Sequence, residues 1–309
     1  MLRRGLTFVF TLVGAIVVIS LGVLLVLYVA VGRGPSIPSK SLLVLEVGGD
    51  LAENPPADVV SYLRGRRAPT VRSIVDTLRK AKTDTRIAAV LLKTTGFSSP
   101  YWGKVQEVRD AVLDFRTSGK PVHAYLDYAD ERNYYLATAA DRISLMPSAT
   151  LDLRGVATYA LFLRGTFDKL GVVPDMHHIG DYKTAVNAYT EKTYTPAHKA
   201  MDEWLNRDLF DQIVRGVAET RKKTEAEVRA LVDDGPFLAR AALEAGLVDE
   251  LAYEDQAAQR LRGPATKRSM PALTLDDYDA VTLASLGLNR GPRIAVVYAS
   301  GAIVGGRGG

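Results

Sequence analysis

The stretch RIAAVLLK, Arg86–Lys93, is an apolar run of the length of a buried β-strand, and its two flanks decide the fold class. Upstream, apolar residues recur at helical spacing, at Val71, Ile74, Val75 and Leu78. Downstream they do so again, at Val105, Val108, Val112 and Phe115, before the next apolar run at 121–126. Strands that alternate with helices need crossover connections, so the pattern predicts a mainly parallel sheet with helices packed against it.

The same alternation extends in both directions. The run SLLVLEV at 41–47 predicts an earlier strand, and NYYLATAA at 133–140 predicts a short buried helix before the strand RISLMP at 142–147. Thr195, followed by Pro196, predicts the start of a long helix. We therefore expect one α/β domain over residues 41–262.

The N-terminal segment predicts a membrane anchor. Residues 6–31 carry no charge, and a bilayer is crossed by a helix of roughly 20 apolar residues. The alternative, a removed signal peptide, is disfavoured by the length of this run and by the lack of a convincing cleavage site. Two arginines in residues 1–5 place the N-terminus in the cytoplasm and the domain outside it. Residues 32–40 are rich in Gly, Pro and Ser and indicate a tether.

The C-terminal part predicts the beginning of a second domain. Residues 263–292 contain prolines and little periodicity, and we interpret them as a linker. The run RIAVVYASGAIVGG at 293–306 then repeats the character of the first strand, an apolar run followed by glycines. We expect residues 293–309 to be the truncated start of a domain that repeats the first.

Composition excludes several classes of function. The net charge is only +4, and no run of like charges indicates a nucleic-acid surface. The absence of cysteine excludes disulfides, thiolate metal sites and a cysteine nucleophile in this chain. The four histidines, His123, His177, His178 and His198, show no metal-binding spacing, and no glycine loop suited to a nucleotide is present. We expect neither a metal nor a cofactor.

One lysine allows two interpretations. In HHIGDYKTAVNAYT, residues 177–190, Lys183 follows a glycine turn and has no acidic residue closer than Asp181. A lysine becomes a general base only when burial lowers its pKa toward neutrality. Spacing alone favours the other interpretation, a solvated or snorkelling surface charge.

Three segments carry a family resemblance: GDYKTAV at 180–186, NYYLATAADRISLMPSATLDLRGV at 133–156 and ALEAGLVDEL at 242–251. Together they resemble the signal peptide peptidase A family, in its long bacterial form with two tandem domains. The resemblance implies a fold of the ClpP/crotonase type. It also implies that Lys183, flanked by Tyr182 and Thr184, is the general base of a serine/lysine dyad.

The resemblance further implies that the nucleophile lies outside this chain. Catalytic domains of the family hold a serine and two glycines just before the buried helix, where this chain has Glu131, Arg132 and Asn133. The glycine-rich loop that would supply oxyanion donors is replaced by TTGFSSPYW at 94–102. Its serines, Ser98 and Ser99, are more typical of a turn than of a nucleophile. We expect the second domain to supply the serine, and this chain alone to lack peptidase activity.

The function implied is that of a membrane-anchored serine endopeptidase that degrades cleaved signal peptides and other apolar peptides. The implied location is the bacterial inner membrane, with a single span and an extracytoplasmic domain. The implied partners are the bilayer, the second domain and further copies in a ring-like oligomer. One alternative is a non-proteolytic scaffold or binding protein on the same fold. Another is a crotonase-like acyl-CoA enzyme, which fits an extracytoplasmic location badly.

Overall fold

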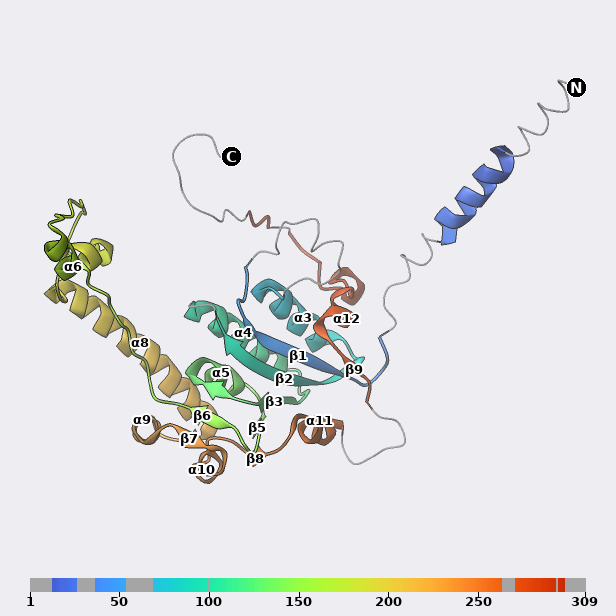
Figure 1. The fold of residues 1–309 in the computed structure, drawn as a ribbon. Coiled ribbons are helices and arrows are strands. Elements are labelled where there is room, and N and C mark those ends of the chain that lie inside the picture. Colours follow the sequence, from blue (N-terminus) through green and yellow to red (C-terminus); the bar gives the residue numbers. More distant parts are fainter. Residues whose placement is uncertain are drawn as a thin grey trace, which may run out of the picture.

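The computed structural model describes residues 13–26, 37–53, 69–98, 101–262, 270–292 and 294–297. Its centre is a parallel sheet with the strand order β8-β5-β3-β2-β1-β9, which confirms the α/β class and the parallel sheet (Figure 1). The strands are β1 Ser41–Gly49, β2 Ile87–Phe97, β3 Val122–Leu126, β5 Arg142–Leu145, β8 Glu250–Leu251 and β9 Ala272–Leu273. In the central pairs Leu43 lies opposite Val90, and Leu92 lies opposite Ala124.

Strand β2 is apolar from Ile87 to Leu92, where helices cover both faces of the sheet. Val90 and Leu92 belong to the main core, whereas Leu91 and Ala89 belong to a second cluster that includes Ala257. The main core is covered by α3 Val71–Thr83, α4 Trp102–Arg116 and α5 Glu131–Ala137. The other face is covered by α11 Glu254–Arg262. Continuous burial on both faces is typical of strands in parallel sheets.

Local signals set the ends of the helices. Thr70 and Ser73 form a capping box that begins α3. Asp130 caps α5 by accepting hydrogen bonds from the backbone nitrogens of Arg132 and Asn133, at 3.0 and 2.9 Å. A small sheet with the order β4-β6-β7 lies beside α5. Its strands are β4 Ala129–Asp130, β6 Thr150–Asp152 and β7 Phe237–Leu238, and α9 Glu225–Asp234 and α10 Ala239–Glu244 flank β7 in the sequence.

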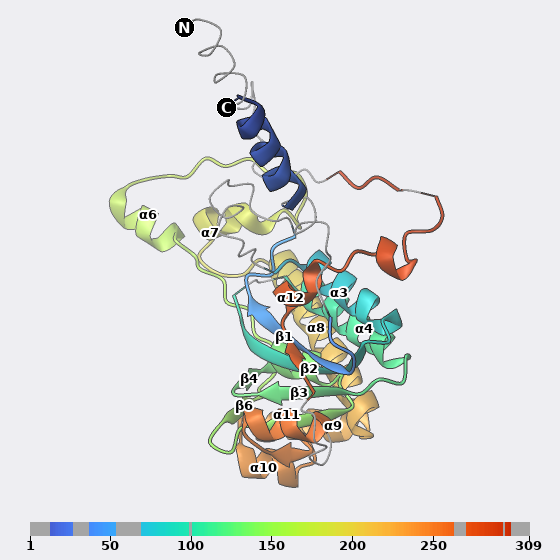
Figure 2. The same cartoon turned by 90° about the vertical axis from the view of Figure 1, so that its right-hand side faces the viewer.

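Helix α8, Pro196–Arg221, extends out of this body, and Figure 1 shows α6 at its far end. A helix of 26 residues is about 39 Å long. Its C-terminal half is buried at Ile213, Val214 and Val217, whereas its N-terminal half carries no buried residue. Figure 2 shows α6 Arg164–Leu170 next to α7 Asn187–Thr190, and η1 Thr184–Val186 directly precedes α7 in the sequence. We refer to residues 154–205 as the arm.

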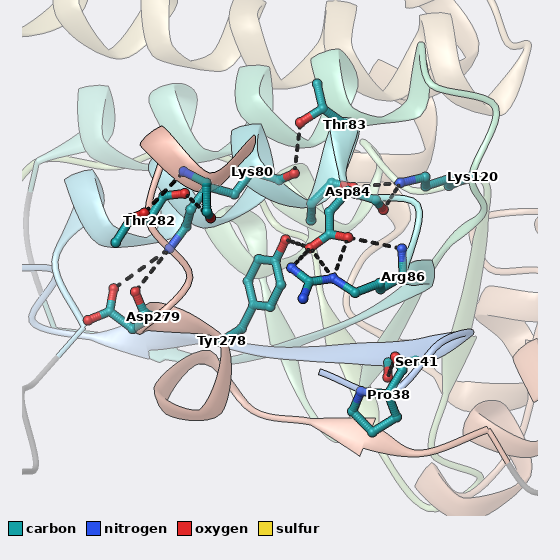
Figure 3. Close-up of polar contacts among 12 residues, drawn as sticks. Pro38, Ser41, Lys80, Thr83, Asp84, Arg86, Lys120, Tyr278, Asp279 and Thr282 are labelled. Atoms are coloured by element: carbon teal, nitrogen blue, oxygen red, sulfur yellow. Dashed lines mark hydrogen bonds and ion pairs between the residues drawn. The ribbon is translucent and has the colours of Figure 1, made fainter. Parts of the chain in front are cut away.

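The described part of the predicted linker, residues 270–292, is folded onto the body. Strand β9 pairs with β1, and α12 Leu275–Asp279 packs against α3 and β1. Tyr278 is fully buried, and its hydroxyl donates to Asp84 Oδ2 at 2.8 Å (Figure 3). A short helix, η2 Ala284–Leu286, follows. This part of the chain therefore supplies an edge strand and a core side chain to the sheet.

The predictions for the two ends of the chain fall largely outside the described residues. Of the predicted span 6–31, the structure describes residues 13–26, which are helical and exposed. Among all described residues, none forms a helix with both the length and the hydropathy needed to cross a membrane. Of the predicted opening strand at 293–306, only residues 294–297 are described, and they adopt no regular secondary structure.

Candidate active site

Lys183 lies on the arm, at the residue that precedes η1. Gly180 adopts a φ of 79°, which a residue without a side chain reaches at little cost. This conformation turns the chain, and the Lys183 backbone nitrogen donates to the Gly180 carbonyl at 3.3 Å. The glycine turn noted in the sequence therefore sets the position of the lysine.

The side chain of Lys183 is exposed, as is that of Tyr182, while Thr184 is half-buried. Within the described part of the chain, the Lys183 ammonium has neither a hydrogen-bond partner nor an ion-pair partner. Isolation from carboxylates is one condition for a base, and removal from water is the other. This chain alone meets the first condition and not the second.

An open groove of about 580 Å³ surrounds the lysine. Its lining is mostly apolar and consists of His177, His178, Ile179, Tyr182, Lys183, Thr184, Ala185 and Val186. Apolar lining around a single amine suits an apolar ligand with one reactive group. Tyr182, Lys183 and Thr184, which were assigned to the site from the sequence, therefore all line this groove.

Asn187 holds this segment to the N-terminus of α8. Its side chain is buried and lies 3.4 Å from Thr195 Oγ1 and 3.5 Å from His198 Nδ1. The His198 ring lies 4.7 Å from the Tyr194 ring, and the Tyr194 ring lies 5.3 Å from that of Phe162. Lys183 therefore lies about one helical turn before Asn187, the residue that contacts the N-terminus of α8.

Glu131 occupies the first position of α5, in the body. Its Oε1 accepts a hydrogen bond from the backbone nitrogen of Arg154 at 2.8 Å. Burial raises the pKa of the Glu131 carboxyl, and nearby Asp130 and Asp152 add to that effect against the hydrogen bond from Arg154. The side chain is thus engaged with the backbone where the arm begins.

The structure does not bring Lys183 and Glu131 together. Lys183 directly precedes η1 on the arm, and Glu131 is the first residue of α5 in the body. Figure 1 shows α6 of the arm far from α5. Ser98 is exposed, its backbone nitrogen donates to the Gly49 carbonyl at 3.0 Å, and Ser99 lies outside the described residues. The described residues place no serine beside the lysine.

The histidines are dispersed. His123 is buried in β3, with its Nε2 2.7 Å from Ser144 Oγ, and burial lowers its pKa. His177 and His178 line the groove, and His198 packs at the end of α8. In the described ranges, no three His, Asp or Glu side chains gather in a way that could hold a metal ion.

Two features escaped sequence reasoning: the arm and the bond between Glu131 and Arg154. The bond joins residues 23 positions apart, and no local pattern signals it. One sequence pattern pointed to the arm: apolar residues recur at helical spacing along α8 as far as Leu205. This residue is 44% exposed and lies well beyond the body. An apolar stripe without a visible partner indicates a surface that another element covers.

Comparison with protein families gives a match to the model for peptidase family S49 over residues 114–267. A chloroplastic serine protease SPPA of Arabidopsis thaliana is 31% identical over 72% of this chain and 34% of its own length. Protease 4 of Salmonella typhi is 28% identical over 87% of this chain and 46% of its own length. A putative signal peptide peptidase SppA of Enterococcus faecium is 24% identical over 72% of this chain and 63% of its own length. The chain thus spans between 34% and 63% of the length of these relatives.

Solved structures give weaker matches. A mutant of the 1510-N membrane-bound stomatin-specific protease has a TM-score of 0.40 and 12% identity, covering 76% of this chain and 97% of its own. A putative enoyl-CoA hydratase/isomerase from Acinetobacter baumannii has a TM-score of 0.35 and 17% identity, covering 70% and 71%. Scores this low support no argument, so the ClpP/crotonase assignment rests on the family resemblance.

Proposed function

Because the chain belongs to peptidase family S49, we propose that it supplies the general base, Lys183, to a membrane-anchored serine peptidase with a serine/lysine dyad. The observation that carries this proposal is the position of the lysine. It stands on an apolar groove of a projecting arm, without a carboxylate partner among the described residues.

The proposed chemistry is acyl transfer to a serine of the second domain. Neutral Lys183 Nζ takes the proton of the serine hydroxyl as its oxygen attacks the carbonyl carbon of the substrate peptide. The tetrahedral intermediate collapses, the C–N bond breaks, and the lysine returns the proton to the leaving amine. Water then hydrolyses the acyl-enzyme with the same lysine as base. Donors outside this chain would stabilise the oxyanion.

Such chemistry requires that another surface cover Lys183, because a solvated lysine stays charged at neutral pH. The arm carries large exposed apolar side chains that such a surface would bury, at Tyr159, Leu161, Leu170, Val173, Ile179, Tyr182 and Trp204. Contiguous exposed apolar side chains mark interaction sites. We propose that the second domain, in the same chain or in another copy of a ring-like oligomer, covers the groove and completes the site.

The proposed substrates are apolar peptides, including cleaved signal peptides, that leave the membrane. The apolar lining of the groove supports this class, as does the name of the Enterococcus faecium relative. The uncharged segment 6–31 supports a single-pass anchor in a bacterial inner membrane, with the N-terminus in the cytoplasm and the peptidase outside it.

The proposal is tested with the full-length protein and an apolar peptide substrate across a range of pH. Lys183→Ala and Lys183→Arg are compared with the wild type, since arginine keeps the positive charge but cannot act as a base. We expect both variants to fold and to lose nearly all turnover. Wild-type rates in both would contradict the proposal.

A non-proteolytic scaffold remains the alternative, favoured by the exposure of Lys183 and by Glu131 at the degenerate nucleophile position. In that case Lys183 is a surface charge, and its replacement leaves binding of the apolar peptide unchanged. Measuring peptide binding beside turnover in the same variants separates the two functions.

A further inference from the structure

The arm joins the body at two places, and α5 takes part in both. At its start, the Arg154 backbone nitrogen donates to Glu131 Oε1. Beyond its other end, α8 packs against α5, where a side chain at Gly216 would lie 2.6 Å from Cε2 of Tyr135. Helix α8 also packs against α9, and its Gln212 accepts hydrogen bonds from Trp102 and Gln106 of α4. We expect a displacement of α5, or loss of the bond between Glu131 and Arg154, to change the direction in which the arm leaves the body.

Helix α5 is tightly packed in the body. Its residues from Asn133 to Ala137 are all buried. The Tyr134 hydroxyl donates to the Leu247 carbonyl at 2.6 Å, and the Tyr135 ring packs on Trp102 with ring centroids 4.9 Å apart. Close packing of this kind transmits small displacements rather than absorbing them.

At the start of α5, Asp130 and Glu131 make different hydrogen bonds, and only that of Glu131 reaches the arm. Asp130 already caps the helix, so Glu131 is not needed for that purpose. Arg154 uses its guanidinium on Asp152, with Nη2 2.8 Å from Oδ2, and its backbone nitrogen on Glu131. Gly155, with a φ of 96°, then turns the chain into the arm.

We propose that Glu131 is a positioning residue for Lys183: it ties the first residue of the arm to α5 and so sets where the lysine meets the serine of the second domain. This inference rests on the proposed function. It assigns a present role to the residue at the degenerate nucleophile position. Displacement of a catalytic group by about 1 Å can lower the rate on the order of a hundredfold.

The chemistry of the tie defines two informative variants. Glu131→Gln keeps an oxygen that accepts from the Arg154 backbone nitrogen, and Glu131→Ala removes it. Arg154→Ala is the matched control, because it removes the exposed guanidinium and its pair with Asp152 but keeps the backbone nitrogen that Glu131 binds.

The experiment measures kcat and KM for an apolar peptide in the full-length protein, together with hydrogen exchange of the Arg154 amide. For Glu131→Ala we expect faster exchange at Arg154 and a kcat lower by roughly ten- to a hundredfold, with KM within about twofold of the wild type. In Glu131→Gln the exchange rate at Arg154 and kcat should stay near those of the wild type. The same is expected for the amide at position 154 and for kcat in Arg154→Ala.

The inference is overturned if Glu131→Ala keeps the wild-type kcat, or if Glu131→Gln loses as much kcat as Glu131→Ala. It is also overturned if exchange at Arg154 is unchanged in Glu131→Ala. Failure of the proposed function has a different signature, which is full turnover in Lys183→Ala. The exchange measurement needs no activity, so the two failures are told apart.

Discussion

Two lysines of this chain have opposite environments. Lys80 is buried, with its Nζ 3.3 Å from the Asp279 carbonyl and 5.3 Å from the Tyr278 ring centroid, and burial lowers its pKa (Figure 3). Lys183 is exposed and unpaired within the described ranges. Burial in a single chain therefore does not identify the general base. In our account, Lys80 anchors α12, and Lys183 is buried only when the site is completed.

Asp84 makes the stability of the body sensitive to acid. Burial alone would raise the pKa of Asp84, but hydrogen bonds from Arg86 and Tyr278 outweigh that effect and hold it below its usual value. Stability from such a group is present above the ordinary pKa of the unfolded chain and is lost as pH falls through the lower folded value. We expect the melting temperature to fall as pH is lowered below the ordinary aspartate value of 3.8.

The measurement is thermal unfolding at a series of acidic pH values for the wild type and Asp84→Asn. The variant should be less stable at neutral pH and should show a shallower loss toward acid, because it lacks one group that takes up a proton on unfolding. Part of the loss of melting temperature toward acid should remain in Asp84→Asn, because the pKa values of Asp249 and Glu250 are also lowered. Identical slopes in both proteins would argue against a role for Asp84.

At the scale of elements, the long regular segments were predictable because their periodicity reports burial. The helical spacing of Val71, Ile74 and Leu78 marks residues that all lie in the core. The two-residue strands β8 and β9 had no such signal, since pairing with distant strands alone defines them. The arm was not predictable either, because its first helix, α6, buries none of its residues and therefore has no periodicity set by burial.

The packing of α8 on α5 gives a prediction at this scale. A side chain at Gly216 would meet the Tyr135 ring at 2.6 Å and Arg109 Nη2 at 3.3 Å. Replacing glycine by alanine favours a helix by about 1 kcal/mol, whereas overpacking a core costs about 1–3 kcal/mol. We expect Gly216→Ala to lower the free energy of unfolding, because the Tyr135 ring is held between Trp102 and Arg109.

Gly165→Ala in α6 is the control for this comparison. No atom lies within 4 Å of the Cβ that it would add, so only the gain in helix propensity remains. Chemical denaturation of the two variants should therefore shift the midpoint in opposite directions or, for Gly165→Ala, leave it unchanged. A stabilised Gly216→Ala variant would show that the contact between α8 and α5 is loose.

At the scale of the whole molecule, residues 270–292 complete the body. Strand β9 covers the edge of β1, and Tyr278 fills a core site beside α3. Truncation of a large buried aromatic side chain costs about 3–5 kcal/mol. A protein of residues 37–262 should therefore unfold at a clearly lower temperature than one of residues 37–292. Equal melting temperatures would mean that the segment only rests on the surface.

The candidate site shows the same limit of local reasoning. The turn at Gly180 and the order Tyr182, Lys183, Thr184 were predictable from the sequence, and in the structure the last three residues line one groove. What covers this groove was not predictable, because local sequence patterns do not report contacts between distant surfaces. The arm displays the Lys183 amine on a mostly apolar groove, which in our proposal is one half of the active site.

The most direct test of the central claim, that Lys183 is the general base, restores the amine chemically. This chain contains no cysteine, so Lys183→Cys introduces its only thiol. In a full-length protein whose other cysteines, if present, have been replaced, alkylation with 2-bromoethylamine rebuilds a lysine-like side chain at that position. We predict that Lys183→Cys is inactive and that alkylation restores turnover, with a pH optimum shifted toward acid because the nearby sulfur makes the amine less basic. Full turnover before alkylation, or none after complete alkylation, would contradict the account.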